Sequence, residues 1–374
     1  MGRFFAESPD KMKNICILTV VDSISTTSMP VNEFVLFRER KGYPYRQVMI
    51  VCSKVGDEKV NIPASIDTYF VGDSKSEFRN RLKLLKTECY ERGESLVCHL
   101  HGQKSAIAFF IASRGLDLRR HTLYTVHSTY SSRDFKYRVS SCICSLLANY
   151  ANCVSNASYN EYSSFVKSVK GKRLLAIQNG VDVERIQEAT AQLPKHVEVA
   201  DMRKLVCVGR MIPIKNQQFL VRLMKHLPDT ELILIGKEDE KIAALAKEEG
   251  VENRVIMTGL IPRDEVFRRL NECGIYVSAS LVEGMPVSVL EAMTLGLVPV
   301  LSNIAPHEEV AHGCMFMRNL PLVEEEWVKA IKGYQVLIEC ERKNLTAYIK
   351  NSIIQSFSLE RMHEQYDAIY KNLV

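Results

Sequence analysis

Residues 275–301 carry the pattern that most constrains how this chain can fold: a strand, a short loop, a helix and a second strand. The first strand is the run IYVSAS at 275–280. Pro286 then opens the helix, because the first helical turn does not use the N–H that proline lacks. Gly296 ends the helix, as glycine often does, and the apolar run at 298–301 is the second strand.

The same alternation extends along the chain. Strict alternation of strands and helices predicts parallel sheets covered on both faces, which is the α/β class. A length of 374 residues is long for one domain and suits two. In the first half we expect strands at 14–21, 46–53, 66–71, 96–102, 121–129, 152–158 and 174–178, with helices at 31–41, 77–92 and 133–148. In the second half we expect strands at 204–208, 231–235 and 254–257, with helices at 216–226, 240–249 and 263–271.

Two carboxylates stand beside the start of the helix that Pro286 opens. Glu283 lies in the loop after the strand, where open α/β sheets bind ligands, and Glu291 lies inside the helix. A helix N-terminus attracts phosphate, and Gly284 lets backbone amides approach a ligand. Together these features suit a ligand with many hydroxyls and a diphosphate, such as a nucleotide sugar. The alternative is a pair of ordinary glutamates in a βαβ unit.

A second loop, GRMIPIKN at 209–216, follows the strand at 204–208. Arg210 can chelate a diphosphate in fork geometry, and Lys215 can act as a mobile point charge. The alternative is two surface cations.

The composition excludes several classes of protein. A hydrophobic content of 46% and a charged content of 25% are typical of a soluble globular protein, and a net charge of +5 does not imply nucleic acid binding. No apolar run reaches the ~18 residues of a membrane span. The first residues lack the apolar core of a signal peptide, and Ala6 stands where a myristoylation motif has Ser or Thr. We therefore expect a cytoplasmic protein.

The cysteines agree with a reducing compartment. There are 11, and no C-x-x-C pair is present. Four of them fall in expected strands, where a free cysteine acts as a small buried hydrophobe. A redox or zinc role for Cys142 and Cys144 is an alternative.

The stretch from Glu283 through Pro286 to Glu291, with Gly296 and Pro299, resembles the E-x7-E signature of retaining glycosyltransferases with the GT-B fold, most like family 4 (glycosyl transferases group 1). The resemblance implies two Rossmann-like domains whose parallel sheets face across a cleft that holds the active site. It implies an acceptor domain at 1–186, a linker at 187–203, a donor domain at 204–357, and a C-terminal helix at 358–374 that crosses back to the first domain.

The resemblance also assigns roles to the donor residues. Glu283 is expected to bind the donor-sugar hydroxyls, Glu291 the ribose hydroxyls, and Arg210 with Lys215 the diphosphate. The expected catalytic residues are His127, Arg210, Lys215 and Glu283. The expected donor-binding residues are Arg210, Lys215, Gly236, Ile261, Glu283, Gly284, Met285, Pro286, Val287 and Glu291.

In the first domain the resemblance is looser. Family members often carry a Gly-Gly pair in the loop after the first strand, and here Ser25 and Thr26 stand in a loop rich in hydroxyls. His99 and His101 resemble the H-x-H segment of the family, and His127 its T-x-H. We expect Ser25, Thr26, His99 and His101 to bind the acceptor.

The expected reaction is retaining transfer of a hexose-type sugar from a nucleoside-diphosphate sugar, with UDP favoured, to a hydroxyl of a glycan, glycolipid or small-molecule acceptor. The departing phosphate takes the acceptor proton, and domain closure excludes water. We expect no cofactor and no metal, because the chain has no D-x-D signature. Cell-surface polysaccharide assembly is the expected setting.

The basic amphipathic helix at 77–92 suggests peripheral contact with the cytoplasmic face of a membrane. Two other readings of the whole chain stay open. One is a GT-B sugar-nucleotide epimerase or hydrolase, and the other is a catalytically silent GT-B scaffold subunit.

Overall fold

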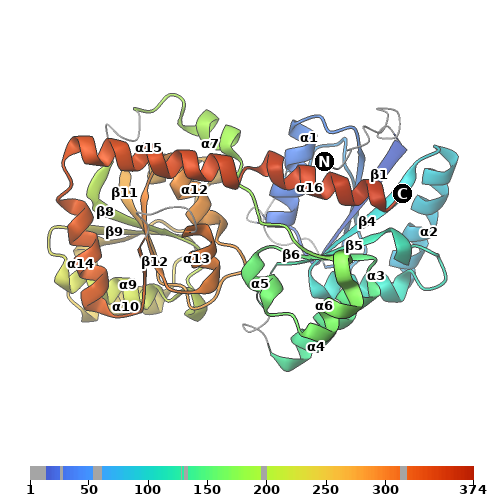
Figure 1. The fold of residues 1–374 in the computed structure, drawn as a ribbon, viewed down its shortest axis with the longest axis horizontal. Helices are drawn as coiled ribbons and strands as arrows, with labels where there is room; N and C mark the ends of the chain where they lie inside the picture. The colour runs from blue at the N-terminus through green and yellow to red at the C-terminus, as the bar shows by residue number, and fades with distance from the viewer. Residues whose placement is uncertain are drawn as a thin grey trace, which may run out of the picture. The chain divides into compact units, whose positions relative to one another are not determined.

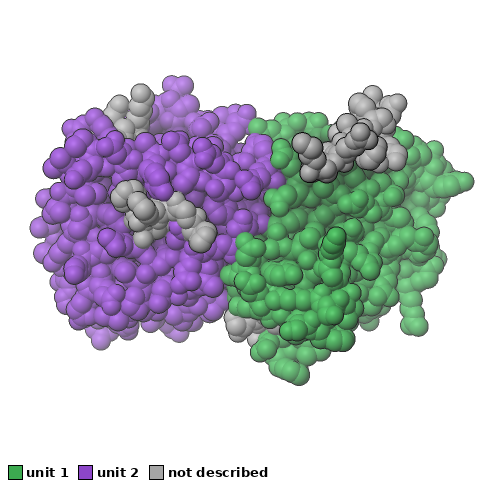
Figure 2. Space-filling model, in the orientation of Figure 1, with its two compact units in different colours: residues 1–177, 363–374 green, residues 178–362 purple. Residues whose placement is uncertain are grey.

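The chain folds into two compact units. The computed structural model describes residues 14–25, 28–53, 61–127, 129, 134–194, 200–311 and 318–374. Unit 1 comprises residues 1–177 and 363–374, and unit 2 comprises residues 178–362 (Figure 2).

Unit 1 is built on a sheet of seven strands, in the order β3-β2-β1-β4-β5-β6-β7, and every described pair is parallel (Figure 1). β1 is buried at every position, as expected for a parallel strand covered on both faces. The strands are β1 (Ile15–Val21), β2 (Arg46–Val51), β3 (Asp67–Phe70), β4 (Ser95–His101), β5 (Thr122–Val126), β6 (Tyr150–Cys153) and β7 (Leu174–Ala176).

Helices connect these strands. In α2 (Lys75–Glu91), Phe78, Leu82, Leu85 and Cys89 form the buried face that the sequence periodicity predicts. The other helices are the π-helix η2 (Pro30–Leu36), α1 (Phe37–Arg40), α3 (Gln103–Ala112), α4 (Phe135–Leu147), α5 (Asn156–Asn160) and α6 (Ser164–Lys170).

The last helix, α16 (Leu359–Asn372), completes the core of unit 1 from residue 363 onward. Arg38 has no exposed surface, and it donates to His363 Nδ1 at 3.3 Å and to the Tyr370 hydroxyl at 2.5 Å. The Tyr366 hydroxyl accepts from Asn152 Nδ2 at 2.9 Å. These partners satisfy Nε and Nη2 of the buried guanidinium, while Nη1 has no hydrogen-bond partner within the described part of the chain.

Unit 2 has a six-stranded parallel sheet in the order β10-β9-β8-β11-β12-β13 (Figure 1). Trp327, the single tryptophan of the sequence, is fully buried in this unit and donates to the Pro321 carbonyl at 2.8 Å. The strands are β8 (Asp201–Val208), β9 (Glu231–Ile235), β10 (Val255–Met257), β11 (Cys273–Ser278), β12 (Val298–Ser302) and β13 (Arg318–Leu320). The helices are α7 (Val183–Thr190), α9 (Gln217–Leu223), α10 (Glu240–Glu248), α11 (Arg263–Asn271), α12 (Val287–Leu295), α13 (Ala305–Ala311), α14 (Glu324–Gln335) and α15 (Glu339–Ser356).

A helix occupies part of the segment that was expected to link the two domains. The compact units divide after residue 177, and α7 occupies the first part of the expected linker at 187–203. Asp182 caps α7 by accepting from the Arg185 N–H at 3.1 Å, and Ile186 is buried. A helix of eight residues with one buried side chain leaves little apolar period in the sequence, so it was missed.

Two shorter segments also differ. The strand expected at 152–158 ends at Cys153, because Ser155 caps α5 by accepting from the Ser158 N–H at 3.1 Å. The helix expected at 31–41 starts as the π-helix η2 before it becomes α1.

None of the helices in the described ranges is long and apolar enough to cross a membrane.

We predict that His307 makes unit 2 less stable in mild acid. Its side chain is fully buried in α13, and burial lowers its pKa to about 4. A histidine in an unfolded chain has a pKa near about 6.5, so below that pH the unfolded chain binds a proton that the folded chain does not. This contribution to stability is complete above about pH 6.5 and is lost as the pH falls toward the folded pKa. From pH 7 to pH 5, His307 should lower the free energy of unfolding by about 2 kcal/mol.

Urea unfolding at both pH values, on the wild type and on His307→Gln, measures this loss. His307 Nδ1 lies 2.9 Å from the Ser302 carbonyl, and a glutamine amide can donate there without titrating. An equal loss of stability in both proteins would contradict the prediction.

Candidate functional site

The strand order of unit 2 indicates where a ligand binds. β8 pairs with β9 on one side and with β11 on the other, so the order reverses beside β8. Open α/β sheets bind ligands at the carboxyl ends of the strands at such a switch point. The loops after β8 and β11 meet there, because the Leu281 N–H donates to the Ile214 carbonyl at 2.8 Å.

An ion pair joins the two loops. Lys215 Nζ donates to Glu283 Oε1 at 2.6 Å, and the Ser280 hydroxyl donates to the same oxygen at 2.7 Å. The side chains keep 20% and 11% of their surface exposed, so the pair is shielded and still reachable. Lys215 has three N–H donors, and two remain for a ligand. The sequence predicted both charged residues, while Ser280, three positions before Glu283, was missed.

Arg210 contributes the second cation of the loop. Its side chain is exposed, and within the described ranges it makes no hydrogen bond or ion pair with another side chain. Its backbone is fixed, since its carbonyl accepts from Gln217 Nε2 at 2.9 Å. The guanidinium is therefore available to an anion.

Gly236 brings the loop after β9 against the loop after β8. The Gly236 N–H donates to the Gly259 carbonyl at 3.2 Å. A Cβ at Gly236 would lie 2.1 Å from the Gly209 carbonyl oxygen, and its φ of +156° also disfavours other residues. Glycine is thus required for this close approach of two backbones at the switch point.

Helix α12 follows the Glu283 loop. It begins at Val287, so Pro286 is the N-cap instead of the first helical residue, and no side chain caps the helix. Met285 and Pro286 are buried, while Gly284 and Val287 are half-buried. An uncapped helix N-terminus leaves backbone N–H groups for an anionic ligand.

Glu291 is held by a residue that the sequence did not reveal. It is 5% exposed, and Arg263 at the start of α11 donates to its carboxylate. Burial raises the pKa of Glu291, and the Arg263 charge opposes that rise. Ile261 lies two residues before Arg263 and is half-buried. No motif links Arg263 with Glu291, so only the tertiary structure identifies this pair.

His307 is a second buried group that was not predicted for the site. Its Nε2 atom has no hydrogen-bond partner in the described part of the chain. The Ser302 hydroxyl lies 3.1 Å from His307 Nδ1 and donates to the Ser280 carbonyl at 2.5 Å, which links His307 to the loop of Glu283.

In unit 1 two of the predicted histidines contact each other. His101 Nδ1 lies 2.9 Å from His127 Nε2, and burial lowers the pKa of His127 to about 4. Both rings are therefore neutral at pH 7. His127 is half-buried, so it retains a surface that a ligand can reach.

The structure does not support the acceptor contact expected for His99. The ring has no exposed surface, and its nitrogens lie 2.8 Å from the Tyr370 hydroxyl and 2.7 Å from the Thr125 hydroxyl. His101 is also buried, with 2% exposed. The side chains on this face of β4 lie beneath α16, which gives His99 a packing role.

The loop after β1 is described only in part. Ser25 is half-buried, and its carbonyl accepts from the Ser28 N–H at 2.9 Å. Thr26 lies outside the described residues.

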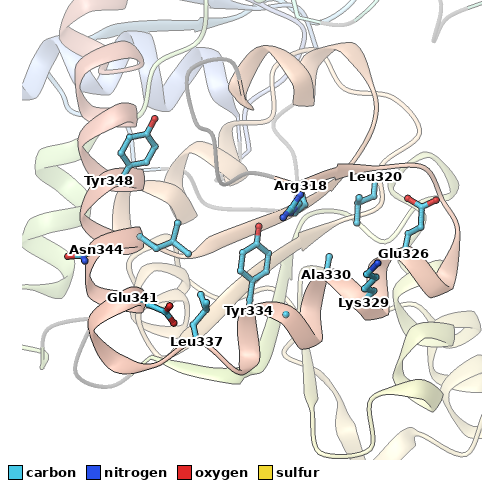
Figure 3. A pocket seen from close by; sticks show the side chains of 12 residues that line it. Arg318, Leu320, Glu326, Lys329, Ala330, Tyr334, Leu337, Glu341, Asn344 and Tyr348 are labelled. Atoms are coloured by element: carbon cyan, nitrogen blue, oxygen red, sulfur yellow. The ribbon is translucent and has the colours of Figure 1, made fainter.

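A separate cavity of unit 2 lies away from the loops after β8 and β11. Figure 3 shows a groove of about 1050 Å³ bordered by side chains from β13, α14 and α15, among them Arg318, Tyr334 and Tyr348. None of the residues predicted for the site lines it. The charged loops at the β8–β11 switch point are therefore the better candidate, because they combine cations, carboxylates and a helix N-terminus.

The fold first defines the class. Solved GT-B structures match the chain over 96% of its length, with a TM-score of 0.76 to sucrose-phosphate synthase from Thermosynechococcus elongatus, at 15% identity and 99% of that chain. The score is 0.69 to HepE from Anabaena in complex with UDP and glucose, at 17% identity and 100% of that chain. The α/β fold with two Rossmann-like units is thus a GT-B fold, as the resemblance implied.

The family follows from the sequence of unit 2. Residues 189–313 match the model of the family described as glycosyl transferases group 1. This stretch holds β8, β11 and α12 with their loops, and its match to the family model confirms the resemblance.

Curated relatives agree with this family. The chain is similar to GDP-mannose:cellobiosyl-diphosphopolyprenol alpha-mannosyltransferase of Xanthomonas campestris, with 27% identity over 58% of each chain, so it spans a little over half of that relative. It is 24% identical to UDP-Gal:alpha-D-GlcNAc-diphosphoundecaprenol alpha-1,3-galactosyltransferase of Escherichia coli, over 87% of this chain and 89% of the relative.

We predict that Arg263→Ala lowers the free energy of unfolding by about 3 kcal/mol, because it leaves the buried Glu291 charge without its partner. Arg268→Ala is the matched control on the same helix. Arg268 is 52% exposed and, among the described residues, pairs with Glu265 alone, so its loss should cost below about 0.5 kcal/mol.

Urea unfolding of these variants and of Arg263→Ala/Glu291→Gln measures the effect. The double variant should be more stable than Arg263→Ala, since a neutral amide needs no counter-charge. If Arg263→Ala lowered the free energy of unfolding no more than Arg268→Ala does, the Arg263–Glu291 pair would not stabilise the protein.

Proposed function

We propose that this chain is a glycosyltransferase that moves a hexose-type sugar from a nucleoside-diphosphate sugar to a hydroxyl of a lipid-linked acceptor. The observation that carries the proposal is the Lys215–Glu283 ion pair at the β8–β11 switch point, with Arg210, which pairs with no side chain among the described residues, in the same loop as Lys215. The family of residues 189–313 and the names of the relatives support it.

The diphosphate is the group that this site suits best. Arg210 offers a planar set of donors, and Lys215 keeps two N–H donors after pairing with Glu283. The N-terminus of α12 adds backbone N–H groups and the positive end of a helix dipole. These groups stabilise the negative charge that the diphosphate gains as the bond to the sugar breaks.

The two glutamates have separate roles in the proposal. Glu283 is fixed by Lys215 and Ser280, so its second oxygen can accept from donor-sugar hydroxyls. Glu291, oriented by Arg263, accepts from the ribose hydroxyls. His127 is a neutral hydrogen-bonding group for the substrate, because burial keeps it unprotonated at pH 7.

We further propose that transfer retains the configuration at the sugar. The departing phosphate takes the proton of the acceptor hydroxyl, so no protein carboxylate has to act as general base. Arg210 and Lys215 supply the positive charge at the diphosphate, and the reaction needs no divalent metal.

The relatives suggest the acceptor class. The Xanthomonas and Escherichia coli proteins are named for acceptors on a diphosphopolyprenol and a diphosphoundecaprenol carrier, respectively. We propose an acceptor of this kind for this chain, within cell-surface polysaccharide assembly. The relatives are named for GDP-mannose and for UDP-Gal. A GDP-sugar is therefore the main alternative to the UDP-sugar that we favour as the donor.

A lipid-linked acceptor requires contact with a membrane surface, and α2 is poorly suited to make it. Arg79 donates to the Ala112 and Arg114 carbonyls at 2.9 and 2.6 Å, and Lys86 donates to the Leu116 carbonyl at 2.7 Å. Arg79 and Lys86 thus bind backbone carbonyls at the end of α3 and just after it, so these two cations are not available to lipid headgroups.

A better membrane surface is the face that we name the α3–α4–α6 apolar face. Helix α4 packs against both α3 and α6 (Figure 1), and each helix exposes large apolar side chains four residues apart. Lys104 and Lys136 are exposed on two of these helices and suit anionic lipid headgroups. The face consists of Ile107, Ile111, Phe135, Val139, Ile143, Phe165 and Val169.

We predict that nucleoside diphosphates and their sugars raise the melting temperature, selectively for one base, because the ligand binds only the folded chain. Arg210→Ala should weaken that binding at least about tenfold, since a charge-assisted hydrogen bond is lost. Arg268→Ala, an exposed arginine on α11, should bind as the wild type does.

A panel of UDP, GDP and their hexoses, read by thermal shift, measures this effect. Turnover with the selected donor should then yield a product with the anomeric configuration of the donor by NMR, and EDTA should not change the rate. Binding without glycosylated product would favour the epimerase or hydrolase, and no binding by any nucleotide would favour the scaffold.

We predict that Phe135→Ser/Ile143→Ser weakens binding to anionic vesicles about tenfold or more, because each buried apolar side chain is worth about 2 kcal/mol. The control is Val336→Ser/Ile338→Ser, which removes two exposed apolar side chains from unit 2. Co-sedimentation with phosphatidylglycerol vesicles measures both. Equal binding by the two variants would remove this face from the proposal.

A further inference from the structure

Unit 1 contains a crevice of about 770 Å³ that no predicted residue lines. Its walls come from the segments that follow β1, β2 and β3, from the first turn of α2 and from one side of α3. These segments lie at the carboxyl ends of the strands, next to the β1–β4 switch point of the first sheet. The crevice therefore occupies the ligand-binding edge of unit 1, as the charged loops do in unit 2.

One end of the crevice is polar. Lys75 is the first residue of α2, and Lys104 lies in the first turn of α3. Neither lysine forms an ion pair with a carboxylate among the residues that the structure describes. Ser53 and Ser74 add hydroxyls to the same walls.

Two acidic residues, Asp22 and Asp73, also line the crevice; burial raises the pKa of Asp22, and the Lys104 charge lowers it. Asp22 accepts from the Ser105 N–H at 2.5 Å, so its carboxylate faces the N-terminus of α3. A Cβ at Gly102 would lie 2.9 Å from Asp22 Oδ2, which shows how closely the helix start holds this side chain. Asp73 is exposed to solvent.

The other end of the crevice is apolar. Phe78 and Ala108 line it, together with Ile107 and Ile111, which are 37% and 48% exposed. The two isoleucines also belong to the α3–α4–α6 apolar face. The crevice thus passes from two lysines to an apolar surface that continues onto the neighbouring helices.

We propose that this crevice binds the diphosphate of an amphipathic acceptor through Lys75 and Lys104, while the lipid chain lies on Ile107 and Ile111. The inference rests on the proposed function and names the part of unit 1 that holds the acceptor. A cation at a diphosphate contributes charge-assisted hydrogen bonds, and the isoleucines contribute apolar burial. A free anion would gain only the charge-assisted hydrogen bonds, and a lipid alcohol would gain only the apolar burial.

Isothermal titration of the full chain tests the proposal with three probes: farnesyl diphosphate below its micelle concentration, inorganic diphosphate and farnesol. Farnesyl diphosphate should bind at least about tenfold more tightly than either of the others, because it uses both ends of the crevice. Lys75→Gln and Lys104→Gln should each weaken it about tenfold. Ile107→Asn/Ile111→Asn should remove its advantage over inorganic diphosphate.

The matched control is Lys83→Gln, an exposed lysine of α2 that does not line the crevice. It should bind farnesyl diphosphate as the wild type does. Equal binding by Lys104→Gln, Lys75→Gln and Lys83→Gln would overturn the proposal, and so would inorganic diphosphate binding as tightly as farnesyl diphosphate.

Arg210→Ala separates this inference from the proposed function. It should weaken nucleotide binding in unit 2 at least about tenfold and leave farnesyl diphosphate binding in unit 1 unchanged. If the crevice variants bound farnesyl diphosphate as the wild type does while nucleotide binding stayed intact, only the acceptor site would be overturned. Failure of nucleotide binding in the wild type would overturn the transferase itself.

Discussion

The parallel pairing of β8 with both β9 and β11 is the constraint on which the site in unit 2 depends. Parallel strands bring their carboxyl ends to one edge of the sheet, so the loops after β8, β9 and β11 converge there. The hydrogen bond from Leu281 to Ile214 and the contact of Gly236 with Gly209 then set their spacing. Without this convergence, Lys215 and Glu283, 68 residues apart in the chain, would not form an ion pair at 2.6 Å.

Each buried or half-buried carboxylate at this edge has its own cation. Glu283 pairs with Lys215, and Glu291 pairs with Arg263. A carboxylate with little exposed surface is costly unless it is paired, so these cations offset that cost and orient both glutamates. Arg210 has no such partner among the residues that the structure describes, so its guanidinium is available to an anionic ligand.

Unit 1 uses the same topology for a different arrangement of groups. Its buried histidines and tyrosines form a hydrogen-bonded core under α16, whereas its exposed isoleucines and lysines border a crevice at the carboxyl edge. His99 illustrates how a motif can mislead: the H-x-H spacing is the same whether the ring faces a ligand or a helix. Its burial against Tyr370 depends on a residue that lies 271 positions away.

The sequence alone determined the α/β class, most strand and helix positions, and the loops that carry Arg210, Lys215, Glu283 and Glu291. These features are local, because apolar runs, helix periodicity and glycine or proline at element ends appear within a few residues of one another. The tertiary structure decided that Arg263 partners Glu291, that His99 is part of the core, and that α4 and α6 expose apolar side chains. It also ended the first unit at residue 177 and placed the end of α7 in the expected linker. Such features depend on which distant residues come into contact, and no local pattern specifies that.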